Sequence, residues 1–242
     1  MKRFLFVFTF LALAAAAHAD SNINAGVPAF SALKPGQALP PALRFVAIPR
    51  IKRNSVALVA DQGITVLKVD SNNSAGSIAL PFNIDPVKTP MLSWRWKVSR
   101  VIDKADMEDK AGDDFAARVY VFFDVPLESL SFTERNKIRL ARLVAGPDVP
   151  TAALVYVWDN KHRIGYAHAS PYTKSVQKFV LQSGPEHVGA WMSETRSRRA
   201  SALAARSEAT RYEPIASLPR TDSLTCAPIV PVYASVSMSR GA

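Results

Sequence analysis

The chain has 242 residues, enough for one domain with a substantial core or for two small ones. Its formal net charge is +10, but residues 20–195 hold 21 basic and 17 acidic residues, scattered rather than gathered into a stripe. A nucleic-acid-binding surface is therefore not expected. Cys226 is the only cysteine, which excludes an intramolecular disulfide, a Cys-based zinc site and a Cys-pair redox motif.

Residues 1–19 have the pattern of a secretory signal peptide. Lys2 and Arg3 give a positive start, residues 4–17 form an apolar run, and Ala17-His18-Ala19 fits the small-x-small cleavage rule. That run is too short to span a membrane, and no later run approaches 18 apolar residues. We expect cleavage after Ala19, no membrane span in the mature protein, and a periplasmic or secreted location.

Residues 20–54 are rich in Pro, Ala and Ser and predict an extended lead-in, with an edge strand over 43–51. Period-two hydrophobicity then predicts strands over 55–60 and 64–69, joined by a turn at Asp61-Gln62-Gly63. A third strand is predicted over 77–82. Residues 55–196 are taken as the folded domain.

A tryptophan-bearing strand is predicted over 91–98. Leu92, Trp94, Trp96 and Val98 share one face and alternate with polar residues, which indicates a half-buried strand with both tryptophans in the core. Residues 116–124 are apolar on both faces, which is typical of a central strand.

The hydrophobic period changes after this strand. Ser131 and Glu134 have the spacing of a capping box, and residues 133–144 predict a helix that Gly146-Pro147 ends. Two further strands are predicted over 152–158 and 175–181. Many short strands with one inserted helix indicate a single β-sandwich of the jelly-roll type.

The composition changes again after Arg196. Residues 197–242 are rich in Ser, Ala, Arg and Pro and contain no Phe, Trp or Lys. Two explanations stay open: a disordered tail, or a reading frame that shifts near Arg196 and replaces the native final strands.

A loop dense in carboxylates separates the tryptophan strand from the central strand. Asp103, Asp106, Glu108 and Asp109 offer the oxygen ligands that Ca²⁺ prefers, although their spacing is not that of an EF-hand. Lys104 and Lys110 offset part of this charge. The alternative is a solvated loop with no bound ion.

Two further groups are candidates for ligand binding. Asp113 and Asp114 precede the central strand, where they would either bind a ligand hydroxyl or pair with Arg118. Trp158-Asp159-Asn160 ends another strand, where the tryptophan is either a platform for a sugar ring or part of the core.

Other sites lack support in the sequence. His162, His168 and His187 do not have zinc-ligand spacing. There is no Gly-x-Ser-x-Gly elbow and no Gly-rich phosphate loop. No catalytic residue is assigned.

Several motifs taken together resemble a known family. They are LKVDSNNSAGSI (67–78), PMLSWRWKV (90–98), DDFAARVYVFFD (113–124), ALVYVWDN (153–160) and SPYTKSVQKFVLQSG (170–184). The chain resembles the bacterial exported family catalogued as domain of unknown function 3047. The resemblance implies a galactose-binding-type β-sandwich and no particular reaction, and it implies further aromatic strands where residues 197–242 depart from the pattern.

Three functions are therefore weighed. The first is a non-catalytic exported module that binds a glycan or an envelope polymer, which is favoured by strand-end aromatics, carboxylates and the lack of a catalytic motif. The second is a carbohydrate-active hydrolase that uses a carboxylate pair. The third is a structural or interaction protein with no small-molecule site.

Overall fold

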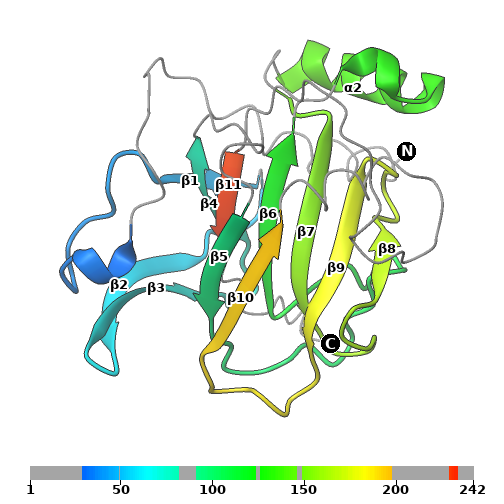
Figure 1. Cartoon of the computed structure of the whole chain (residues 1–242). Helices are drawn as coiled ribbons and strands as arrows, with labels where there is room; N and C mark the ends of the chain where they lie inside the picture. Colours follow the sequence, from blue (N-terminus) through cyan, green and yellow to red (C-terminus); the bar gives the residue numbers. More distant parts are fainter. Residues whose placement is uncertain are drawn as a thin grey trace.

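The computed structural model describes residues 29–48, 50–81, 91–123, 126–145, 149–197 and 229–233. The signal-peptide prediction lies outside these residues, as do most of residues 197–242. The described part is mainly β, with one α-helix, and its sheets are not closed into a barrel (Figure 1). Within it, no helix is long and apolar enough to cross a membrane.

The largest sheet has seven strands in the order β1-β4-β11-β6-β7-β9-β8. Its strands are β1 (Arg44–Ala47), β4 (Gly76–Pro81), β11 (Ile229–Tyr233), β6 (Ala117–Phe123), β7 (Ala152–Asp159), β9 (Val176–Ser183) and β8 (Ala167–Ala169). Strands β7 and β9 are parallel, while the other pairs of described strands in this sheet are antiparallel. The prediction of a central strand is confirmed, because β6 is almost wholly buried between β11 and β7.

A two-stranded ribbon covers one face of this sheet. It pairs β5 (Met91–Trp96) with β10 (Met192–Ser197) in antiparallel register. The alternation predicted for the tryptophan strand is confirmed: Trp96 is buried and Trp94 packs partly buried against the same cluster. Their rings lie 5.7 Å apart in an edge-to-face arrangement, and each also contacts an aromatic ring of β7.

The opposite face of the sheet is covered by the loop that joins β5 to β6. Met107 and Phe115 from this loop are almost fully buried against Tyr120 of β6, Val157 of β7 and Val180 of β9. The apolar residues of β6 and β7 thus pack on one face against the β5–β10 ribbon and on the other face against this loop. The loop is a layer of the core, and this layer positions the site described below.

A hairpin forms the third sheet, from β2 (Ser55–Asp61) and β3 (Ile64–Asp70). Gln62 and Gly63 between them have φ values of +52° and +78°, as the two central residues of a type I′ turn require. The turn predicted at Asp61-Gln62-Gly63 is therefore confirmed, with Gln62 and Gly63 as its central residues. The hairpin packs with the β1–β4 edge through Leu43, Ile78 and Leu80.

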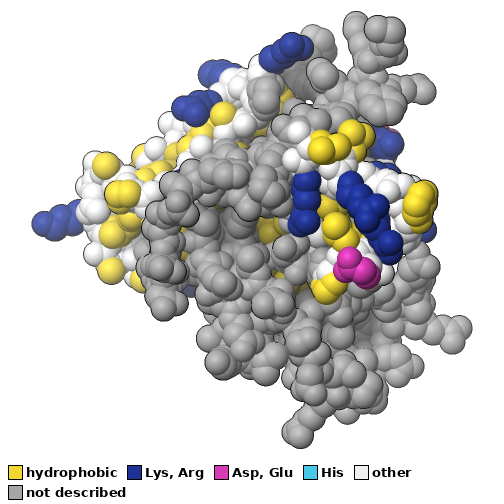
Figure 2. Space-filling model, turned by 90° about the horizontal axis from the view of Figure 1, so that it is seen from above, with side chains coloured by type: hydrophobic (Ala, Val, Ile, Leu, Met, Phe, Trp, Pro, Cys, Tyr) yellow, Lys and Arg dark blue, Asp and Glu magenta, His cyan; other side chains and the backbone are white. Residues whose placement is uncertain are grey.

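Helix α2 (Phe132–Ala145) connects β6 to β7 at the end of the sheet that lies opposite the β7–β8 loop (Figure 1). The Glu134 backbone N–H donates to Ser131 Oγ at 3.3 Å, which confirms the predicted N-terminal cap. Ile138 and Ala141 on the helix are buried. Figure 2 shows Lys and Arg side chains beside hydrophobic ones on the face seen from above. Phe132 and Leu143 of α2 are 74% and 83% exposed.

Two short 3₁₀ turns complete the elements: η1 (Phe30–Ala32) and η2 (Leu127–Ser129). The sequence did not predict β8, β10 or β11. Strands β8 and β11 are short, and β10 is polar at most of its positions. Strand β11 belongs to the compositionally distinct tail and lies between β4 and β6. The predicted strand over 43–51 is an edge strand, but it is confined to β1.

Candidate functional site

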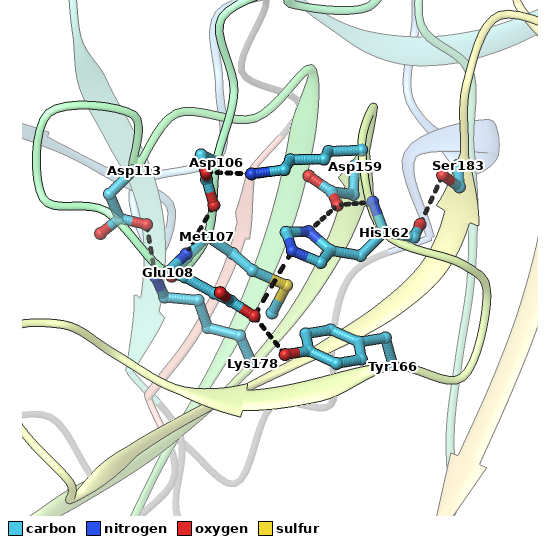
Figure 3. A network of polar contacts seen from close by, with 10 residues as sticks. Asp106, Met107, Glu108, Asp113, Asp159, His162, Tyr166, Lys178 and Ser183 are labelled. Carbon is cyan, nitrogen blue, oxygen red and sulfur yellow. Dashed lines mark hydrogen bonds and ion pairs between the residues drawn. The ribbon is translucent and has the colours of Figure 1, made fainter.

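The site lies at the end of the sheet where β7 finishes and β6 begins. Ala117 of β6 pairs with Trp158 of β7, so the acidic loop before β6 meets the turn that follows Asp159. Strand β9 runs parallel to β7, and the connection between them carries β8. Three segments that are distant in sequence therefore converge on one place (Figure 3).

A buried lysine on β9 holds the acidic loop against the sheet. The Lys178 side chain is 2% exposed, and its Nζ donates to Asp113 Oδ1 at 2.5 Å and to the Met107 carbonyl at 3.0 Å. Burial lowers the pKa of Lys178, although the negative charge of Asp113 opposes that shift. Asp113 therefore holds the loop on the sheet through its buried ion pair with Lys178.

Asp106 and Glu108 stand on the outer side of the same loop. The Glu108 backbone N–H donates to Asp106 Oδ1 at 3.0 Å, which fixes the relative position of the two residues. Lys161 Nζ hydrogen-bonds to Asp106 Oδ2, and the Tyr166 hydroxyl donates to Glu108 Oε1. These hydrogen bonds lower the pKa of both carboxyl groups, and the bond to Glu108 raises the pKa of Tyr166.

His162 approaches the two carboxylates from the turn after β7. Its Nδ1 lies 2.8 Å from Asp159 Oδ2, and the same oxygen accepts the His162 backbone N–H at 2.8 Å. Asp159 is 1% exposed, so it holds the imidazole from inside the protein. The other ring nitrogen, Nε2, lies 3.6 Å from Glu108 Oε1 (Figure 3).

Aromatic rings line one side of this cluster. The rings of His162, Tyr166 and His168 are stacked, with centroid separations of 4.7 and 6.3 Å and interplanar angles of 11° and 8°. Tyr172 adds a second tether, since its hydroxyl donates to the Lys110 carbonyl at 2.8 Å. The acidic loop is thus held by side chains from the turn after β7, from β9 and from the connections around β8.

The structure brings together only some of the residues predicted from sequence. Asp106, Glu108 and Asp159 lie in the cluster, whereas Asp103 and Asp109 are exposed elsewhere on the loop and are not among the donors that converge with His162. The Asp109 carboxylate accepts the Ala111 N–H at 3.2 Å.

The remaining predicted residues lie beside the cluster. Trp158 is 1% exposed and donates through Nε1 to the Gly184 carbonyl at 3.2 Å, so it belongs to the core and its ring face is closed to a sugar. The Arg118 guanidinium lies over the Phe115 and Tyr120 rings. Asp114 and Asn160 are half-buried next to these residues.

A family model described as "Protein of unknown function (DUF3047)" matches residues 43–216. The chain belongs to the DUF3047 family. This confirms the resemblance inferred from the motifs, and the matched region of the DUF3047 chain contains every residue of the cluster. The match runs past Arg196, so its end does not coincide with the change in composition. No curated protein and no solved structure matches the chain.

Sequence reasoning missed His162, Tyr166 and Lys178. The first two have no spacing that links them to the acidic loop, because only the sheet brings them there. Lys178 did carry a signal: the alternation of β9 places it on the same face as Val176 and Val180. A lysine on an apolar face requires a buried acceptor, and a search for that acceptor would have led to Asp113.

Proposed function

We propose that this DUF3047 protein is an exported, non-catalytic binding module for a glycan or a similar hydroxyl-rich envelope polymer. One observation carries the proposal: Asp106, Glu108, Lys161 and Tyr166 gather their polar groups at one end of the sheet, beside stacked rings. Carboxylates accept hydrogen bonds from neighbouring hydroxyls, and the ammonium and phenol groups donate them. A sugar offers both kinds of partner on each ring.

The electrostatics of the cluster favour binding over hydrolysis. A glycoside hydrolase needs one carboxyl group with a raised pKa, so that it stays protonated and acts as general acid. Here Lys161 lowers the pKa of Asp106 and Tyr166 lowers the pKa of Glu108. Both groups are thus held as acceptors, which suits a site that binds hydroxyls without cleaving the bond between sugars.

The location and the finer fold class are part of the same proposal. The leader-like residues 1–19 support export to the periplasm or the medium. The layered packing of the β5–β10 ribbon on the large sheet supports a sandwich of the galactose-binding type. Envelope polymers would be the hydroxyl-rich ligands available to a protein in that location.

A glycan array, followed by titration with the polysaccharide that binds best, tests the proposal. We expect Asp106→Asn and Glu108→Gln to weaken binding by about tenfold each, since each removes a charged acceptor. Asp103→Asn, on the same loop but outside the cluster, is the matched control and should bind like the unmodified protein. No binding to any polysaccharide, or equal loss in the control, would contradict the proposal.

The same samples distinguish binding from turnover. Release of reducing ends from the bound polysaccharide, abolished by Glu108→Gln with the fold intact, would favour the hydrolase instead. Unchanged polysaccharide length after prolonged incubation is the result expected for a binding module.

A further inference from the structure

We infer that Asp106, Glu108 and His162 form a binding site for one divalent transition-metal ion of the Zn²⁺ type, with Asp159 as the positioning residue behind the imidazole. The inference concerns the same end of the sheet as the glycan proposal but does not rest on it. It begins from geometry: one donor atom from each of the three residues lies within 4.8 Å of the other two.

The tautomer of His162 is the first argument. Asp159 Oδ2 accepts hydrogen bonds and cannot donate one when ionised, so the proton of the neutral ring resides on Nδ1. Nε2 then directs a lone pair toward Glu108 Oε1, 3.6 Å away. Two acceptors that face each other at this distance repel unless a cation, either a proton on Nε2 or a metal ion, lies between them.

The second argument is the buried carboxylate itself. Metal-binding histidines commonly donate their other N–H to a carboxylate, which fixes the ring and raises its basicity. Asp159 is 1% exposed, and its Oδ1 has no hydrogen-bond partner among the described residues. In Figure 3 this carboxylate lies beside the imidazole on the side that faces Asp106. A buried polar atom without a partner is costly, and a cation nearby would offset that cost.

The donor set selects the kind of ion. Ca²⁺ takes six to eight oxygen ligands, and imidazole is not among its preferred donors. One imidazole with two carboxylates suits Zn²⁺, which in catalytic and exposed sites keeps three protein ligands and an open position. We therefore expect Zn²⁺ or a similar transition-metal ion at this cluster rather than the Ca²⁺ that the acidic loop alone suggested.

The site needs only a small closure to reach metal-bonding distances. A tetrahedral Zn²⁺ with ligands at about 2.0–2.1 Å places donor atoms roughly 3.3 Å apart. The Glu108 side chain is 44% exposed and can turn toward the ion if its hydrogen bond from the Tyr166 hydroxyl adjusts, while His162 is held by Asp159 and is 12% exposed. Binding would displace Lys161 from Asp106 or move it to the other lone pair.

Isothermal titration calorimetry tests the inference. The full chain is first treated with a chelator to remove bound metal and is then titrated with Zn²⁺ alone. We expect one site per chain, with affinity reduced more than about tenfold in Asp106→Asn, Glu108→Gln and His162→Gln. Asp109→Asn and His187→Gln are matched controls, since they remove the same group types outside the cluster. Unchanged affinity in the three cluster variants, or absence of binding to the unmodified chain, would overturn the inference.

Asp159→Asn tests the positioning role. We expect Zn²⁺ affinity to fall about 10- to 100-fold, as for other carboxylates behind a metal-binding histidine. The ¹⁵N chemical shifts of the His162 ring should show a weakened Nδ1–H hydrogen bond, because the neutral amide oxygen of Asn is a poorer acceptor than a carboxylate. If this buried variant does not fold, the ring ¹⁵N shifts of the unmodified chain still test the positioning role, because an Nε2–H tautomer would overturn it. Because these titrations contain no polysaccharide, their failure and the failure of the glycan proposal are distinguishable.

Discussion

The two ends of the acidic loop have similar side chains and opposite roles. Asp113 lies beneath the loop, where its carboxylate meets Lys178 and both side chains are almost fully buried. Asp106 and Glu108 lie on the outer surface, where Lys161 and Tyr166 contact them from the side. Position relative to the sheet, rather than residue type, therefore separates a carboxylate that holds the fold from one available to a ligand.

Breaking the buried pair should have the largest effect. Asp113→Ala would leave the buried Lys178 ammonium without its charged partner, and we expect the free energy of unfolding to fall by about 3–5 kcal/mol. Urea denaturation measures this. The double variant Asp113→Leu/Lys178→Met should recover most of the loss, because an apolar pair avoids the cost of desolvating two charges. A single variant as stable as the unmodified chain would refute the structural role.

Glu134 on α2 is, like Asp113, a carboxylate that the fold holds in a buried position. Glu134 accepts hydrogen bonds from Lys137 at 2.7 Å, from Ser175 at 3.0 Å and from Thr173. Burial raises its pKa, but these hydrogen bonds outweigh burial and hold the pKa below the ordinary value of 4.5. We expect Glu134→Gln to cost about 2 kcal/mol at neutral pH.

The pH dependence of this variant has a definite sign. Since the folded-state pKa is the lower one, the unfolded chain binds more protons as the pH falls, and the stabilisation is present above pH 4.5. It is lost as the pH falls through the folded-state value. Thermal unfolding of the unmodified chain and of Glu134→Gln should therefore converge below pH 4.5, and a constant gap would contradict the assignment.

An apolar change can test whether the fold positions the outer carboxylates. A Cβ on Gly112 would lie 2.9 Å from Asp106 Cβ and 3.0 Å from Asp106 N, closer than side chains approach. We expect Gly112→Ala to cost about 1–3 kcal/mol through overpacking and to weaken Zn²⁺ binding by displacing Asp106. Ala111→Ser, at the exposed neighbouring position, should change neither quantity.

The smallest effect on stability is expected at the surface. Lys161 is 57% exposed, and its ion pair with Asp106 should contribute little to folding. Its removal should nevertheless help a cation, because Lys161→Met takes a competing positive charge from Asp106. In the presence of a chelator, we expect Lys161→Met to have the same melting temperature as the unmodified chain. In its absence, we expect the variant to bind Zn²⁺ about fivefold more tightly than the unmodified chain. Weaker binding in this variant would mean that Lys161 supports the site rather than competing with an ion.

The sequence predicted the elements with strong periodicity and missed those without it. Alternation placed Trp94 and Trp96 correctly, and Ser131 marked the start of α2, because burial and capping leave local patterns. Strand β10 has a single buried residue, Glu194, which pairs with Gln182, so it shows no hydrophobic alternation. The parallel pairing of β7 with β9 is equally invisible, since the three-residue β8 between them has no pattern of its own.

The sequence predicted some residues of the candidate site and missed others. The density of carboxylates pointed to Asp106 and Glu108, and the strand-end motif pointed to Asp159. His162 follows Asp159 by three residues, yet its relation to Glu108 depends on how β6 pairs with β7. Trp158 was ambiguous for the opposite reason: composition suits a sugar platform, and only the packing of the β5–β10 ribbon shows that its ring is covered.

The contacts that shape the acidic loop also constrain when it can form. Lys161 is 55 residues from Asp106 along the chain, Tyr166 is 58 residues from Glu108, and Lys178 is 65 residues from Asp113. Contacts across such separations slow folding, because the chain loses loop entropy before they form. During synthesis the loop emerges long before its anchor, so it acquires its final shape only after residue 178 has been made and β9 has joined the sheet. Residues at the two ends of the loop should therefore reach their native contacts only after β7 and β9 have paired.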